Sequence, residues 1–131
     1  MKVLVDTSVW SLALRRNEQS EISIKLADLI LSSIVVMIGP VRQELLSGIS
    51  NKNTFLTLKS KLDAFDDYPI TKYEYERAAE FYNNCRKHGI QGSHVDFLIC
   101  AVAHNNGLYI FTTDEDFHSF MKYLPIKLLQ N

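Results

Sequence analysis

The stretch LYIFTTDEDF, residues 108–117, joins a short apolar run to an abrupt cluster of acids. Leu108–Phe111 is continuously apolar, which predicts a strand buried on both faces. Two threonines follow, and then Asp114, Glu115 and Asp116. This much negative charge directly after a core strand indicates either a helix cap or one part of a metal site.

Two further runs have the same buried-strand pattern, Lys2–Val5 and Ile34–Ile38. The short stretches 68–70 and 126–129 are additional candidate strands. The remaining segments show helical spacing of apolar residues: 9–15, 20–32, 41–48, 51–65, 73–88, 93–106 and 114–123. Continuous apolar strands that alternate with helices predict an α/β fold, a three-layer α/β/α sandwich with a mainly parallel sheet. We expect one domain over residues 1–131.

Composition narrows the class of protein. With 47% hydrophobic residues the chain can bury a substantial core. Its 14 basic and 15 acidic residues give a net charge of −1, so affinity for nucleic acid would require a local basic patch or bound cations. The N-terminal apolar run is too short for a signal peptide and is interrupted by Asp6. No apolar run is long enough to span a membrane. Cys85 and Cys100 lack metal-ligand spacing. These features predict a cytoplasmic protein with reduced thiols and no membrane partner.

Four acids are placed so that they can meet. Asp6 and Asp114 each follow a predicted strand, and ligands of open parallel sheets bind beyond the carboxyl ends of the strands. Glu44 lies one turn into the helix after the second strand, so its side chain can reach back toward the same edge. Asp96 lies in the first turn of the helix over 93–106, where it can also face that edge.

Four converging carboxylates would repel one another strongly unless they bind a cation. Hard oxygen ligands without a cysteine or histidine cluster favour Mg²⁺, for which Mn²⁺ can substitute. Such a site suits hydrolysis of a phosphodiester, with carboxylates that orient the attacking water or accept its proton. Taken singly, Asp6 and Asp114 could be helix caps, Asp96 could complement a helix dipole, and Glu44 could be a solvated helix residue. Their joint placement favours the shared site.

The segments VDTSVW at 5–10, ELLSG at 44–48 and GSHVDFLICAVAHNNGLYIFTTDEDF at 92–117 resemble, in order and spacing, the PIN-domain ribonucleases. Within that family they are most similar to the VapC toxins of type II toxin–antitoxin systems. The resemblance runs over nearly the whole chain. It implies a PIN-like fold and Mg²⁺-dependent endoribonuclease activity.

The resemblance also implies roles for individual residues. The catalytic and metal-binding acids fall on Asp6, Glu44, Asp96 and Asp114. Supporting polar positions fall on Asp116, Ser8 and Thr112. Contacts to RNA phosphates are expected from basic residues whose segments start at the predicted active edge, namely Arg15, Arg16 and Arg42.

The resemblance therefore implies a toxin that cleaves RNA, forms a homodimer and is silenced by a small antitoxin protein. One alternative is a stand-alone PIN-like nuclease of RNA processing, which would have no antitoxin gene beside it. A second alternative, from another class, is a non-catalytic binding module in which the acids hold a structural cation or only cap helices.

Overall fold

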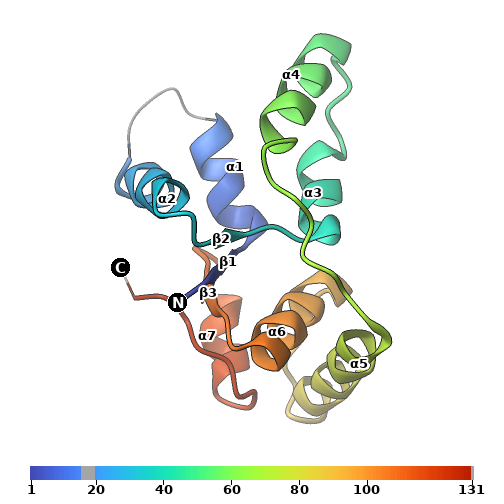
Figure 1. The fold of residues 1–131 in the computed structure, drawn as a ribbon. Helices are drawn as coiled ribbons and strands as arrows, with labels where there is room; N and C mark the ends of the chain where they lie inside the picture. Colours follow the sequence, from blue (N-terminus) through green and yellow to red (C-terminus); the bar gives the residue numbers. More distant parts are fainter. Residues whose placement is uncertain (16–19, 131) are drawn as a thin grey trace.

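The computed structural model describes residues 1–15 and 20–130, with only the backbone for Arg15. Three short strands and seven helices follow one another within these residues (Figure 1). The elements are β1 (Val3–Val5), α1 (Thr7–Arg15), α2 (Glu21–Leu31), β2 (Val35–Val36), α3 (Gly39–Leu46), α4 (Lys52–Leu62), α5 (Lys72–Lys87), α6 (His94–Asn106), β3 (Tyr109–Phe111) and α7 (Asp116–Met121).

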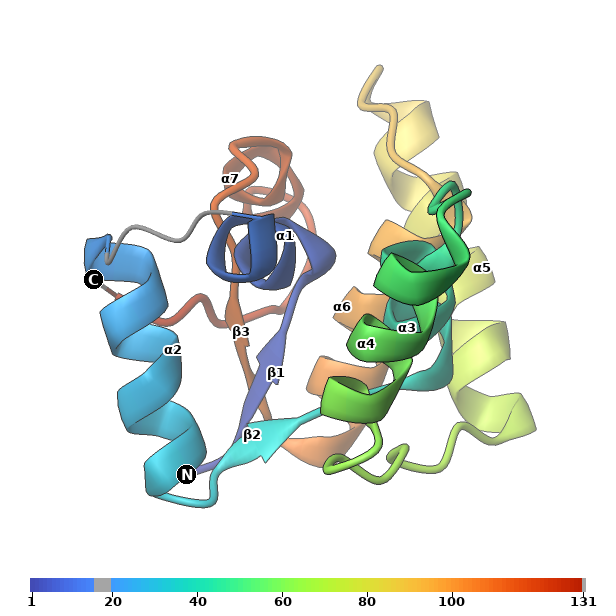
Figure 2. The same cartoon turned by 90° about the horizontal axis from the view of Figure 1, so that it is seen from above.

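The strands form a parallel sheet in the order β2-β1-β3, which confirms the predicted mainly parallel α/β fold. Helices α1 and α2 lie on one side of the sheet, and α6 and α7 lie on the other (Figures 1 and 2). Helix α5 packs outside α6, while α3 and α4 lie together on one side of the molecule. Since β1 is central and fully buried, the residue that follows it emerges in the middle of the sheet edge.

The expected strand at 68–70 is present only as a single parallel bridge between Met37 and Asp67. The Tyr68 N–H donates to the Met37 carbonyl at 2.7 Å. Pro69 comes next, and proline has no N–H to continue a ladder of hydrogen bonds. The segment therefore extends the sheet beside β2 by one residue pair.

The C-terminal segment departs from the sequence prediction at two places. The helix expected over 114–123 begins two residues later and is shorter, because Asp114 stays outside it and accepts a hydrogen bond from the Asp116 N–H at 2.9 Å. The strand expected at 126–129 is reduced to one parallel bridge, from Leu128 to β3. Both changes leave the sheet order unaltered.

Local sequence explains where three helices begin. Helices α2, α5 and α6 each start with a capping box, in which the cap side chain and the third helical side chain bond to each other's backbone N–H. The cap residues are Ser20, Thr71 and Ser93. Helix α6 ends at Gly107 with φ of 66°, a conformation that glycine adopts without strain.

Helix α6 is the central helix of the core. Its residues from Phe97 to Ala103 are all buried, so the helix is covered on nearly every side rather than along one stripe. No helix of the described part of the chain is long and apolar enough to cross a membrane. The burial of α6 fixes the position of its first turn, where Asp96 lies.

The turn that leads into α6 has room only for glycine at residue 92. A Cβ atom there would lie 2.6 Å from Phe120 Cζ and 3.0 Å from two ring atoms of Phe97. Both rings are buried and cannot move away easily. We expect Gly92→Ala to lower the free energy of unfolding by about 1–3 kcal/mol, as overpacking does, in urea denaturation.

Gly39→Ala is the matched control, because its added Cβ would meet only Asp67 Oδ2, at an ordinary 3.6 Å. Equal stability of the two variants would contradict this description of the turn before α6.

Candidate active site

Asp6 occupies the end of the central strand and is buried, with 4% of its surface exposed. Its backbone N–H donates to the Phe111 carbonyl at 2.9 Å, which continues the pairing of β1 with β3. Its Oδ2 accepts hydrogen bonds from Ser8 Oγ and Thr112 Oγ1, both at 2.8 Å. Hydroxyl groups, rather than the N–H groups of α1, therefore hold this carboxylate.

The two hydroxyls also connect the start of α1 to the end of β3. Ser8 Oγ lies 3.3 Å from Thr112 Oγ1 and accepts from the Thr113 N–H at 3.0 Å. Thr112 Oγ1 accepts from the Asp114 N–H at 3.0 Å. The supporting positions expected at Ser8 and Thr112 thus hold both Asp6 and the backbone that leads to Asp114.

Asp114 is oriented by the chain that follows it. Its Oδ1 accepts from the Asp116 N–H at 2.9 Å. The Asp116 side chain is exposed, and within the described residues its carboxylate has no hydrogen bond or ion pair. What Asp116 supplies in this structure is its backbone N–H. Glu115 is also exposed and lies 3.9 Å from His118 Nε2.

Asp96 takes part in the capping box at the start of α6 and also lies near Asp6 and Asp114. Its Oδ2 accepts from the Ser93 N–H at 3.0 Å, while its own N–H donates to Ser93 Oγ at 3.0 Å. Burial raises the pKa of Asp96; the hydrogen bonds from Ser93 oppose this shift, and the negative charges of Asp6 and Asp114 add to it. Asp96 thus lies close enough to Asp6 and Asp114 for their charges to act on it.

Glu44 reaches the same edge from α3. Its Oε1 accepts from Thr7 Oγ1 at 2.7 Å, and Thr7 directly follows Asp6 in the chain. Thr7 was not among the residues expected at the site, so the sequence did not predict this contact. The signal available in the sequence was the position of Thr7, a hydroxyl residue directly after Asp6 and the central strand.

The four carboxylates share one arrangement. In each, one oxygen is held by a neighbouring hydroxyl or N–H, as described above, and the other has no hydrogen-bond partner among residues 1–15 and 20–130. None of the four forms an ion pair with a lysine, arginine or histidine of that part of the chain. Their charge is therefore uncompensated by protein cations, although their orientation is fixed.

This donor set fits a hard divalent cation chemically, since it offers carboxylate oxygens and no sulfur. As the side chains stand, however, no group of three histidine, cysteine, aspartate or glutamate residues in the described chain is arranged tightly enough to enclose an ion. Mg²⁺ typically uses one or two carboxylates directly and reaches others through water, so a looser set suits it.

The expected phosphate contacts receive no support from the structure. Arg16 and the side chain of Arg15 lie outside the described residues. Arg42 donates from Nε to Asp67 Oδ1 at 3.0 Å, from Nη1 to the Leu62 carbonyl at 2.9 Å, and from Nη2 to the Phe65 carbonyl. Its guanidinium therefore secures the end of α4.

Both cysteines are free and buried, as expected for reduced thiols. Burial raises the pKa of Cys100 well above its ordinary value, and the charge of Asp96 adds to the shift. The thiol is thus neutral near pH 7 and unsuited to act as a nucleophile. His94 stacks on Tyr82 with ring centroids 5.1 Å apart, so its ring packs against α5.

Glu74 is a buried acid with a purely structural environment, and it makes a useful contrast with Asp96. It accepts hydrogen bonds from Asn105 Nδ2 at 2.9 Å and from the Thr71 N–H and hydroxyl at 3.1 Å. These bonds, led by that from Asn105, lower the pKa of Glu74 below its ordinary 4.5. They link the start of α5 to the end of α6.

A pKa lowered by folding stabilises the protein above the ordinary pKa, and this contribution is lost as pH falls through the folded-state pKa. We expect Glu74→Gln to flatten the loss of unfolding free energy below about pH 4.5, measured by urea denaturation at a series of pH values. Glu76→Gln, on the exposed face of the same helix, should retain the wild-type slope. An unchanged slope for Glu74→Gln would refute the role of these bonds.

Comparison with known proteins agrees with this architecture. A profile of the PIN domain matches residues 3–122. No curated protein matches the sequence significantly. Several solved structures share the fold at low sequence identity, and three of them are described below.

FitAcB from Neisseria gonorrhoeae is 21% identical with a TM-score of 0.77, and the match covers 98% of this chain and 96% of that one. DNA-bound VapBC from Salmonella typhimurium is 12% identical with a TM-score of 0.78, covering 98% and 97%. VapBC-5 from Mycobacterium tuberculosis, a member of the VapBC family of toxin–antitoxin systems, is 16% identical with a TM-score of 0.70, covering 100% of each. The chain belongs to the PIN domain family, whose members are in general nucleases.

Proposed function

We propose that this chain is a Mg²⁺-dependent endoribonuclease and the toxin of a type II toxin–antitoxin pair. The observation that carries the proposal is the set of four carboxylates at the sheet edge, each oriented through one oxygen and open at the other. A divalent cation held there would supply a nucleophilic water and stabilise the negative charge that develops on the phosphate oxygens. Mn²⁺ is expected to substitute for Mg²⁺.

The residues of the chain have distinct proposed tasks. Asp6, Asp96 and Asp114 hold the cation, and Glu44 assists from α3. A carboxylate of this set that is not bound directly to the cation would orient the attacking water or accept its proton. Ser8 and Thr112 position Asp6, and the Asp116 N–H positions Asp114.

The toxin role is supported by the solved structures that share the fold. Three of the similar structures carry the VapBC name, and one is described as belonging to a family of toxin–antitoxin systems. We accordingly propose a small antitoxin as partner, a homodimer as the active form, and action on RNA in the cytoplasm. A gene for a small DNA-binding protein beside the gene of this chain would favour the toxin over the stand-alone nuclease.

The catalytic proposal predicts two grades of loss. Asp6→Asn and Asp114→Asn should each reduce Mg²⁺-dependent RNA cleavage by more than about a hundredfold, because each removes the negative charge of a proposed ligand. Thr112→Val should cost about 10- to 100-fold, as loss of an outer-shell partner does. Cleavage is measured by gel analysis of a labelled pool of single-stranded RNA, with and without EDTA.

Glu115→Gln is the control, because this acid lies beside Asp114 in sequence yet is exposed. It should retain wild-type cleavage. Near wild-type cleavage by both aspartate variants, or cleavage that survives EDTA, would overturn the proposal. Growth arrest on expression should likewise disappear with Asp6→Asn.

A further inference from the structure

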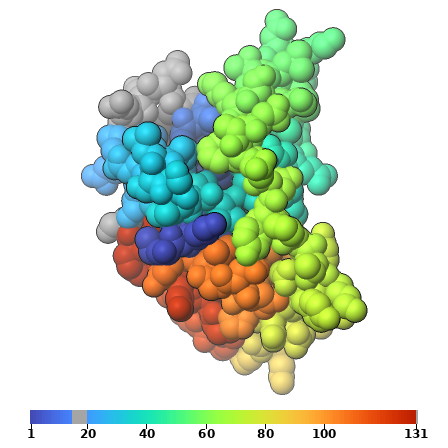
Figure 3. Space-filling view, in the orientation of Figure 1, coloured from blue at the N-terminus to red at the C-terminus, as the bar shows by residue number. Residues whose placement is uncertain are grey.

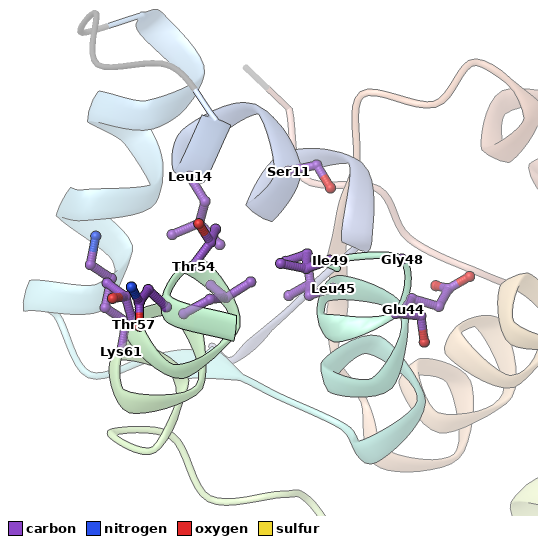
Figure 4. A pocket seen from close by; sticks show the side chains of 12 residues that line it. Ser11, Leu14, Glu44, Leu45, Gly48, Ile49, Thr54, Thr57 and Lys61 are labelled. Carbon is purple, nitrogen blue, oxygen red and sulfur yellow. The ribbon is translucent and has the colours of Figure 1, made fainter. Parts of the chain in front are cut away.

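A groove extends from Glu44 along α4, and Glu44 is the only one of the four acids that lines it. It has a volume of about 570 Å³ and lies between α1, α3, α4 and the loop that joins the last two helices (Figure 4). Glu44 lies at one end of the groove and Lys61 at the other, with Ile49 and Thr54 between them. In the space-filling view α4, in green, forms one side of the molecule (Figure 3).

The groove offers hydrogen-bonding groups of a particular kind. The lining is mixed, with the aliphatic side chains of Leu14, Leu45, Ile49 and Leu58 beside hydroxyl and amide side chains. The hydroxyl and amide groups can bond to ribose hydroxyls and phosphate oxygens: Ser11, Ser47, Asn53, Thr54 and Thr57. Its described lining contains no aromatic ring, so it lacks the platform on which bases usually stack. The polar part of the lining therefore suits contact with a sugar–phosphate backbone more than the stacking of bases.

Charge distinguishes the two ends. Glu44 and Lys61 are the only ionisable residues in the described lining of the groove. Lys61 is exposed and forms no ion pair within the described chain, whereas Lys59, on the same helix, lies 3.9 Å from Asp63. The groove starts at Glu44, one of the four acids, and ends at a cation that is available to bind a phosphate. This arrangement suits a polyanion that passes from the acid site along the groove.

The wall that carries Lys61 is anchored before any ligand arrives. Arg42 binds the carbonyls of Leu62 and Phe65 at the end of α4, and Phe65 packs edge-on against Trp10 of α1 with ring centroids 5.1 Å apart. Helix α4 is thereby fixed to both α3 and α1. The groove is a preformed surface, which lowers the cost of ordering on binding.

We infer that single-stranded RNA leaves the acid site along this groove and that Lys61 binds the phosphate of a flanking nucleotide. This inference rests on the proposed function and adds to it a path for the substrate. Lys61 is a binding residue that acts away from the reacting atoms, so its loss should change affinity for RNA rather than the chemical step. Because the contact is to a phosphate, it should not depend on base sequence.

The test is the salt dependence of cleavage by the full-length protein. A single phosphate contact on single-stranded nucleic acid contributes about 0.7 to the slope of log affinity against log salt. We expect Lys61→Ala to reduce the slope of log kcat/KM against log KCl by about 0.7, through KM, with kcat unchanged. Lys61→Glu should reduce it further, and Lys59→Ala should keep the wild-type slope.

The substrate for this test is a random-sequence pool of single-stranded RNA, and binding of the same pool is followed by fluorescence anisotropy. If wild-type protein neither cleaves nor binds the pool, the proposed function and the inference fall together. If it cleaves the pool and Lys61→Ala has the wild-type slope, the inference alone is wrong, and the groove belongs to another occupant such as a peptide segment of the antitoxin.

Discussion

The parallel pairing of β1 with β3 is the constraint on which the acid site depends. It aligns Val5 with Phe111, so the residues that follow these strands leave the sheet side by side. Asp6 then bonds to β3 through its backbone N–H and, through its carboxylate, to Thr112. A shift of this register by one residue would separate the hydroxyl from the carboxylate and turn each side chain to the opposite face.

Around this pair the site is built by orientation rather than by charge compensation. Hydroxyl and N–H donors hold one oxygen of each acid, and no protein cation of the described chain neutralises them. The repulsion that Asp6 and Asp114 exert on Asp96 is thus not offset by an ion pair within the described part of the chain. On our proposal, a bound cation offsets this repulsion, so the same charges that repel one another also bind the catalytic ion.

Sequence reasoning was most successful where one local signal and one topological rule agreed. Apolar runs predicted the three strands and the parallel sheet, and the acids that follow two of these strands predicted the position of Asp6 next to the segment of Asp114. Sequence reasoning was less successful for side chains whose partners lie far away in the sequence. Arg42 could not be distinguished from a phosphate-binding residue until its contacts with Asp67 and two carbonyls were known. The bond from Thr7 to Glu44 spans 37 residues and has no local signature.

The most direct test of the account is a crystal structure of the protein soaked with Mn²⁺, with anomalous diffraction used to locate the ion. The account predicts one or more manganese peaks between the open oxygens of Asp6, Asp96 and Asp114, with Glu44 bound directly or through water. Absence of any peak at this edge in well-occupied crystals, or manganese bound only elsewhere, would contradict it.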